Sequence, residues 1–211
     1  MMSRHSVLLL LLICLIVPAC CAANDPVCVT NESELRQALT DAGSTAGDNE
    51  IRLQEGTYFT GGLKFAYITS LAHSLNLSGG WYYDHAPCDF QHPWASATIF
   101  DGQATTALLN VSNTANAPGT AVTISNLTLR NGATSSNGQS AALDLFGALG
   151  QDLRVQNVVV LSSHNTTAGS LSIYSNVVTL NGWADIYFIN NLIADSSGPY
   201  ANLAIFTASA T

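Results

Sequence analysis

The feature that most constrains this 211-residue chain is a short apolar pattern that recurs along it. In each copy two aliphatic residues flank one other residue, as expected for a β-strand with one buried face. A unit of this size cannot bury its aliphatic side chains alone, whereas stacked units share a continuous core. The pattern therefore predicts a stack of successive coils. The copies, at intervals of 24 to 34 residues, are Ile51-Arg-Leu53, Leu75-Asn-Leu77, Leu109-Asn-Val111, Leu143-Asp-Leu145, Leu171-Ser-Ile173 and Leu203-Ala-Ile205.

A second strand pattern contains an asparagine at which the apolar phase restarts. Its copies are Val122-x-Ile124-x-Asn126-Leu127-x-Leu129, Leu153-x-Val155-x-Asn157-Val158-x-Val160 and Tyr187-x-Ile189-x-Asn191-Leu192-x-Ala194. The change of phase indicates a sharp bend, and asparagine tolerates the left-handed backbone conformation that a bend needs. We expect Asn126, Asn157 and Asn191 to stack as a structural ladder, with their amides hydrogen-bonded along the stacking axis.

Together the two patterns predict an all-β fold for residues 24–211, a right-handed parallel β-helix (solenoid) of about six coils. The irregular spacing disfavours a propeller, and no helix recurs as leucine-rich repeats or βαβ units would require. The alternative fold is an antiparallel β-sandwich.

One helix is expected, over residues 33–42. Asn31 is a good N-cap, and Glu34 follows three residues later. The apolar residues Leu35, Ala38, Leu39 and Ala42 then fall on one helical face. We expect this helix to cap the first coil, because an uncovered sheet edge is a template for aggregation.

The N-terminus is typical of a secretory signal peptide at residues 1–23. Arg4 precedes an apolar run from Val7 to Val17, and small residues up to Ala23 follow. Eleven helical residues reach roughly 16 Å, too short to span a hydrocarbon core of about 30 Å. We therefore expect a secreted or cell-surface protein without a transmembrane span. In the alternative, the segment ending at Cys20 resembles a bacterial lipoprotein box, and Cys20 carries a lipid anchor.

Two cysteines, Cys28 and Cys88, remain after the leader is removed. In an exported protein such a pair predicts a disulfide, with two free thiols as the alternative. The net charge of -8, with 6 Lys+Arg against 14 Asp+Glu, argues against a nucleic-acid partner, because binding to phosphates needs basic residues.

Several segments resemble bacterial secreted or surface proteins of the right-handed β-helix, pectin-lyase-like group. They are Val29 to Ala42, Ile51 to Tyr58, Leu75 to Trp81 and Ile124 to Gly132. The chain is also similar to polymorphic outer-membrane proteins and autotransporter passengers. The resemblance implies an exported module with a structural, adhesive or glycan-contacting role, and a polysaccharide or cell-surface glycan as partner. Because the chain stops soon after the sixth copy, we expect the C-terminal coil to need a continuation or a partner.

The alternative function is a polysaccharide lyase or glycoside hydrolase whose active coils lie largely outside this chain. Such chemistry needs two groups in reach of one bond. The acids are scattered, and the paired-Asp and His-Gly signatures of pectin hydrolases are missing. Asp144, on the outward face of a strand, is the best catalytic candidate, although a solvated strand residue explains it as well. The histidines lack ligand spacing, so neither a metal nor another cofactor is expected.

Aromatic residues supply the candidate ligand contacts. Phe146, Tyr174 and Phe206 follow the inward aliphatic residues of successive copies and are expected to stack about 4.8 Å apart as an exposed strip. Such a strip would either bind sugars or an apolar partner, or lie under connecting loops. The loop Gly79–Trp94 is also rich in aromatic residues. It either grips a carbohydrate or folds Trp81 and Trp94 over the first coils, held by Cys88.

Overall fold

The computed structural model describes residues 23–135, 139–166, 178–183, 185–197 and 203–207. Most of these residues form β-strands, and the described part contains one helix. Apart from one short hairpin, the strand pairs in these ranges are parallel. The predicted all-β class is therefore confirmed, and the antiparallel sandwich considered as an alternative is wrong.

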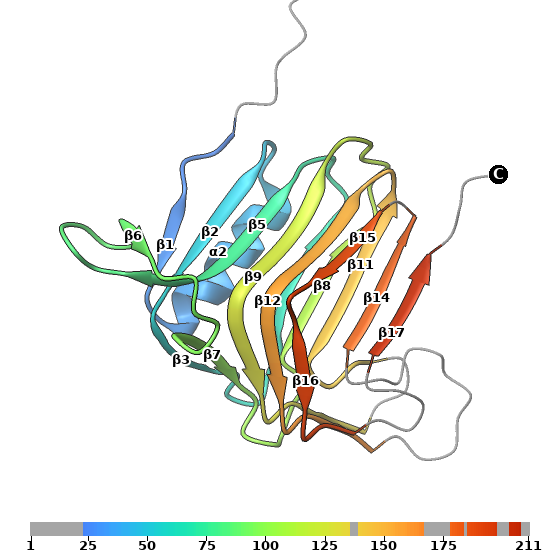
Figure 1. Cartoon of the computed structure of the whole chain (residues 1–211). Coiled ribbons are helices and arrows are strands. Elements are labelled where there is room, and N and C mark those ends of the chain that lie inside the picture. Colours follow the sequence, from blue (N-terminus) through green and yellow to red (C-terminus); the bar gives the residue numbers. More distant parts are fainter. Residues whose placement is uncertain (1–22, 136–138, 167–177, 184, 198–202, 208–211) are drawn as a thin grey trace, which may run out of the picture.

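The strands form two large sheets that face one another (Figure 1). The ten-stranded sheet has the order β1 (Val27–Val29), β2 (Asn49–Gln54), β5 (Leu75–Tyr82), β9 (Ala121–Arg130), β12 (Asp152–Leu161), β15 (Ile186–Ile189), joined by β3 (Gly56–Phe59), β6 (Phe90–Gln91), β7 (Thr98–Asp101) and β16 (Leu192–Ala194). The five-stranded sheet contains β4 (Phe65–Thr69), β8 (Leu109–Asn113), β11 (Leu143–Leu149), β14 (Val178–Trp183) and β17 (Leu203–Thr207). A two-stranded sheet pairs β10 (Ala133–Thr134) with β13 (His164–Asn165). The chain passes between the large sheets repeatedly.

The helix α2 spans Glu32–Ser44, two residues longer at its C-terminal end and one at its N-terminal end than predicted. Asn31 is its N-cap, and its side chain accepts a hydrogen bond of 3.0 Å from the Glu34 N–H. The four residues predicted to form the apolar face, Leu35, Ala38, Leu39 and Ala42, are all buried. This face packs against β1, β2 and β4 at one end of the molecule (Figure 1). Among the described residues, no helix has the length and apolar character needed to cross a membrane.

The first two copies of the asparagine-containing pattern align as the sequence predicts. Leu153 of β12 pairs with Val122 of β9, and Val160 pairs with Leu129 on the far side of the bend. All four side chains are almost fully buried. The phase restart at the asparagine therefore keeps both halves of each strand facing the core.

The prediction for the third copy is wrong by one residue. The inward residues of β15 are Ile186 and Phe188, which pair with Leu153 and Val155 of β12. Tyr187 and Ile189, the residues expected to point inward, are exposed. Because all four residues of β15 are apolar, the alternation that sets the phase elsewhere is missing here.

The first apolar pattern does not follow a single sheet. Ile51 and Leu75 belong to β2 and β5 of the ten-stranded sheet, whereas Leu109, Leu143 and Leu203 belong to the five-stranded sheet. The fifth copy, Leu171-Ser-Ile173, lies outside the described residues; β14 supplies the strand between β11 and β17 instead. Both sheets bury one face, so the same local pattern suits a strand of either sheet.

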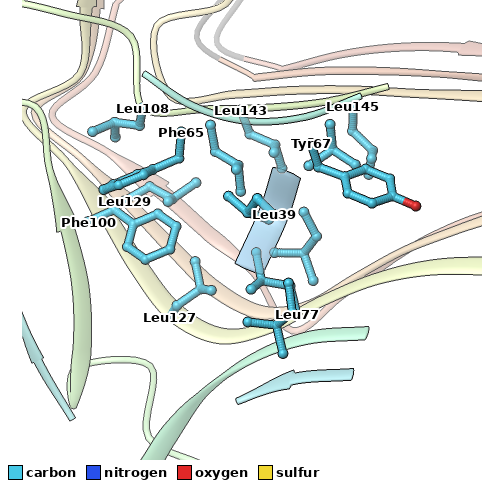
Figure 2. Packing of buried hydrophobic residues seen from close by; sticks show 14 of the residues in the cluster. Leu39, Phe65, Tyr67, Leu77, Phe100, Leu108, Leu127, Leu129, Leu143 and Leu145 are labelled. Carbon is cyan, nitrogen blue, oxygen red and sulfur yellow. The ribbon is translucent and has the colours of Figure 1, made fainter. Parts of the chain in front are cut away.

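The core is a single apolar cluster to which the helix and both sheets contribute. Figure 2 shows Leu39 of α2 pointing toward residues of the two sheets, among them Leu77 and Leu143. Close to this end, the Phe100 ring packs against Phe65 with centroids 4.9 Å apart. The helix therefore completes the core where the first strands would otherwise leave it open.

Candidate functional site

The hairpin of β5 and β6 carries the most exposed aromatic cluster in the described residues. β5 continues past the ten-stranded sheet and turns back as β6, so that the hairpin projects from the two sheets (Figure 1). Gly80 has a φ of 78°, and a Cβ at this position would lie 2.0 Å from the His92 carbonyl oxygen. Glycine therefore allows the His92 segment to approach, and the His92 N–H donates to the Gly80 carbonyl at 2.7 Å.

Three rings of this segment stack on one another; we call Tyr82, His92 and Trp94 the aromatic stack. The His92 ring lies in the middle, with centroid distances of 4.4 Å to Tyr82 and 4.5 Å to Trp94 and interplanar angles of 16° and 9°. The Phe90 ring packs against the Tyr82 ring, with centroids 5.2 Å apart. Trp94 is 61% exposed although one of its faces covers His92. The rest of the indole therefore faces solvent.

Connections to the rest of the protein fix this segment at several points. The predicted disulfide between Cys28 and Cys88 is present and joins β1 to the hairpin. The Asn157 amide donates to the Pro93 carbonyl at 2.6 Å, and the Thr128 hydroxyl donates to the Ala95 carbonyl at 2.9 Å. The aromatic stack is thus held on a rigid support, which lowers the ordering cost of any binding event.

The two tryptophans of the loop differ in environment, which corrects the expectation that both fold over the first coils. Trp81 is partly buried: its indole N–H donates to the Ser78 hydroxyl at 2.9 Å, and the Arg52 guanidinium lies 4.3 Å from its ring. Trp94 instead faces solvent. The sequence contains a signal that separates them, because Phe90, His92 and Trp94 alternate and so share one face of an extended segment.

Carboxylates lie near Tyr82 and His92 of the aromatic stack. Glu55 accepts a hydrogen bond of 3.0 Å from Nδ1 of His92. Partial desolvation raises the pKa of the Tyr82 phenol, and so do the nearby negative charges of Asp84, Asp89 and Glu55. Hydrogen bonds from three backbone N–H groups of the loop lower the pKa of Asp89 and keep it ionised. Three carboxylates therefore lie near the Tyr82 end of the stack, and the Arg52 guanidinium is on Trp81.

The strip predicted from Phe146, Tyr174 and Phe206 does not form as expected. Phe146 of β11 pairs with Asn181 of β14, which in turn pairs with Phe206 of β17. Asn181 thus separates the two phenylalanines, and Tyr174 lies outside the described residues. The error has the same cause as the misplaced fifth copy, because the sequence pattern assigned Leu171 to Ile173 to this strand instead of Val178 to Leu180.

Asp144, the catalytic candidate, lies between Asn110 and Thr179 in the register of the five-stranded sheet. Its side chain is partly buried. Burial raises the pKa of its carboxyl to about 6, against the opposing charge of Lys64. Neither register neighbour is an acid, so these positions do not supply the second carboxylate that hydrolysis of a glycosidic bond needs.

Sequence reasoning missed the pairing of Asp101 with Arg130, which it treated as scattered residues. The Arg130 guanidinium donates to Asp101 at 2.8 Å, and the Asn131 amide donates to the same carboxylate at 3.0 Å. Burial alone would raise the pKa of Asp101, but hydrogen bonds from Gln103, Asn131 and Arg130 outweigh it and lower the pKa. The pair joins the last residue of β7 to the last residue of β9, which is a structural role.

The asparagine ladder includes two of the three predicted residues. The Asn157 amide donates to Asn126 at 2.8 Å, and the Asn190 amide donates to Asn157 at 3.3 Å. All three have φ between 52° and 55°. The prediction of Asn191 is wrong, because the ladder follows the shifted phase of β15. Asn191 accepts from the Val158 N–H at 2.7 Å instead.

The histidines serve different local purposes. His73 is buried, and Nε2 lies 2.6 Å from the Tyr67 hydroxyl. His164 Nδ1 lies 2.9 Å from the Ser197 hydroxyl. Within the described ranges, no three His, Cys, Asp or Glu residues are grouped so that they could hold a metal ion.

A groove of about 330 Å³ lies between α2, β2, β1 and the segment before β1. Its walls include the carboxylates of Asp25, Glu34, Asp41 and Glu50. Three of these are already engaged, Glu34 by Thr30, Asp41 by Gln37 and Glu50 by Arg52. The aromatic stack is therefore the stronger candidate for a binding site.

Comparison of the chain with protein-family models, with curated proteins and with solved structures finds no match. The fold and the site define it as a mainly parallel all-β protein with an exposed, disulfide-anchored aromatic hairpin.

Proposed function

We propose that this chain is an exported right-handed parallel β-helix, of the pectin-lyase-like kind that its repeats resemble. Support comes from the parallel order β2-β5-β9-β12-β15 in one sheet and the matching order β4-β8-β11-β14-β17 in the other. A chain that visits two parallel sheets in turn adds one strand to each with every passage. Right-handed crossovers are the general rule for parallel strands.

Export is supported by two features. The first 23 residues have the composition of a signal peptide, and the cysteines that remain after its removal form a disulfide. Disulfides persist in oxidising compartments outside the cytosol. Both features support the proposal that the protein works outside the cell or on its surface, as a structural, adhesive or glycan-contacting module.

The single observation that supports glycan contact is the exposure of Trp94 on a fixed support. A tryptophan that is 61% exposed leaves a large apolar surface in water. Its segment is already held in place by the disulfide and by side-chain hydrogen bonds from Thr128 and Asn157 to its backbone carbonyls. Aromatic faces carry partial negative charge and pack well against the weakly positive C–H face of a pyranose ring. The arrangement thus offers a preorganised surface for a sugar.

The test is a glycan array probed with the chain from residue 24 onward and with its Trp94→Ala variant. We expect the variant to bind about two- to tenfold more weakly, since an aromatic contact contributes about 0.5–1.5 kcal/mol beyond its buried area and about 1.4 kcal/mol corresponds to tenfold. Tyr187→Ala is the matched control, because it removes an exposed ring that lies on β15. Equal binding by wild type and Trp94→Ala, or no binding to any glycan, would contradict the proposal.

A further inference from the structure

The charges around the aromatic stack restrict what kind of saccharide can approach it. Glu55 contacts the middle ring of the stack, and Asp84 and Asp89 act electrostatically on Tyr82. The side chain of Asp84 is 53% exposed and lies 3.4 Å from His85. Asp89 is held as a carboxylate by the backbone of the same loop. A negatively charged ligand would therefore be repelled from this surface.

The protein also has few cations left to offset this repulsion. After the leader, the chain contains four arginines and one lysine. Each arginine is already engaged: Arg36 with the carbonyls of Thr60, Leu63 and Lys64, Arg52 with Glu50, Arg130 with Asp101 and Arg154 with Asp152. Lys64 lies next to β4 of the other large sheet, where its charge acts on Asp144. Recognition of a carboxylate or sulfate normally uses an arginine or lysine. Among the described residues only Arg52 reaches this hairpin, where it lies over Trp81 and donates to the Cys88 carbonyl, and its charge is already paired with Glu50.

Resting on the function proposed above, we infer that the aromatic stack binds saccharides without negative charge, neutral or amine-bearing, and excludes uronic acids and other acidic sugars. The apolar face of a neutral pyranose meets Trp94 without an electrostatic penalty. An amino group on the sugar gains attraction from the surrounding carboxylates and from the rings. A uronate must instead bring its carboxylate toward Glu55 and Asp84.

The experiment compares three β-1,4-linked hexasaccharides by isothermal titration. Cellohexaose is neutral, the glucosamine hexamer carries amines at C2, and the glucuronic acid hexamer carries carboxylates at C6. At about 20 mM salt, where surface charges are weakly screened, we expect the glucosamine hexamer to bind most tightly. The glucuronic acid hexamer should bind at least about tenfold more weakly than cellohexaose, and about 0.5 M salt should reduce this difference.

Charge variants test whether the carboxylates cause the selectivity. Asp84→Asn should bring the affinities of the neutral and acidic hexamers closer together, whereas Asp41→Asn, the same change on α2, should leave their ratio unchanged. An unchanged ratio in Asp84→Asn overturns the inference. So does equal Trp94-dependent binding of the neutral and acidic hexamers, or a set of Trp94-dependent array hits that are acidic; both results leave the proposed glycan contact standing. An array without any Trp94-dependent hit rejects both proposals.

Discussion

Two aspartates show how strongly the immediate surroundings of a carboxyl group decide its behaviour. Asp101 is buried among hydrogen-bond donors, and its pKa is lowered. Asp144 is partly buried between Asn110 and Thr179, and burial raises its pKa to about 6. Ionisation of Asp101 therefore favours folding, whereas ionisation of Asp144 opposes it.

The pH dependence of stability follows from the shift at Asp144. Its folded-state pKa of about 6 exceeds the unfolded value of about 3.9. The free-energy cost of ionising Asp144 in the folded protein is consequently absent below about pH 4 and grows as the pH rises through 6. We expect Asp144→Asn to raise the free energy of unfolding by about 1–2 kcal/mol at pH 8 and to change it little at pH 4. Denaturant unfolding at both pH values measures this difference.

Asp101→Asn serves as the comparison with the opposite sign. Because the folded-state pKa of Asp101 is lowered, its contribution is present above the unfolded pKa and is lost as the pH falls through the folded pKa. The variant should therefore destabilise the protein by about 1–2 kcal/mol at pH 8, since it weakens the hydrogen bonds that the Asp101 carboxylate accepts from Gln103, Asn131 and the half-exposed Arg130. If both substitutions changed the free energy of unfolding equally at pH 8, the surroundings of the two carboxyls would not determine how their ionisation affects stability.

At the scale of elements, the asparagine ladder connects the strand bends to the aromatic hairpin. Asn126, Asn157 and Asn190 occupy corresponding bends with left-handed backbone. The amide of Asn157 has two hydrogens, which are donated to Asn126 and to the carbonyl of Pro93. One side chain thus links two neighbouring strands and also holds the segment that carries Trp94.

Asn157→Gly isolates the contribution of this side chain, because glycine adopts the φ of 53° without strain. We expect a loss of about 1–3 kcal/mol in the free energy of unfolding, from two hydrogen bonds and the added freedom of glycine. Binding of the array glycans should weaken as well. Ser162→Gly is the control: Ser162 has a φ of 47°, and its backbone N–H bonds to Ala194. If both glycine variants unfold alike and bind glycans as wild type does, the ladder does not support the site.

The element scale is also where sequence reasoning reached its limit. The cap and the apolar face of α2 were predictable because both depend on residues within one or two turns. The phase of β15 was not, because Ile186 to Ile189 are all apolar and only pairing with β12 selects the inward residues. The ladder position follows the phase of β15, so the sequence did not distinguish Asn190 from Asn191.

At the scale of the whole molecule, one covalent link joins the first strand to the aromatic hairpin. The disulfide between Cys28 and Cys88 closes a loop across 60 residues. The helix and both sheets share one core, so a constraint on this loop affects the entire fold.

The Cys28→Ala/Cys88→Ala double variant should lose about 3–4 kcal/mol in the free energy of unfolding, the loop-closure entropy expected for this length. Wild type unfolded in the presence of a reductant should match the variant, because no other cysteine remains after the leader. Denaturant unfolding with and without reductant makes the comparison. A double variant as stable as the oxidised wild type would show that the disulfide does not constrain the unfolded chain.

Local patterns in the sequence by themselves determined much of this protein. Alternating aliphatic residues predicted strands, the Asn31 cap predicted the helix, and the even pair Cys28 and Cys88 predicted the disulfide. Asn126 and Asn157 marked their bends because few other residues tolerate a left-handed conformation. The strands, the helix and the bends depend on residues close together in the chain, and the disulfide was predicted from the even number of cysteines after the leader.

Tertiary structure alone decided which strands share a sheet, which residues pair across them and what remains exposed. Strands of either sheet bury alternate residues, so Leu75 and Leu109 look alike in sequence although they lie in opposite sheets. Likewise, Trp81 is covered and Trp94 is exposed because of contacts with Arg52 and with the neighbouring strands. These outcomes depend on partners tens of residues away, and a local periodicity carries no information about them.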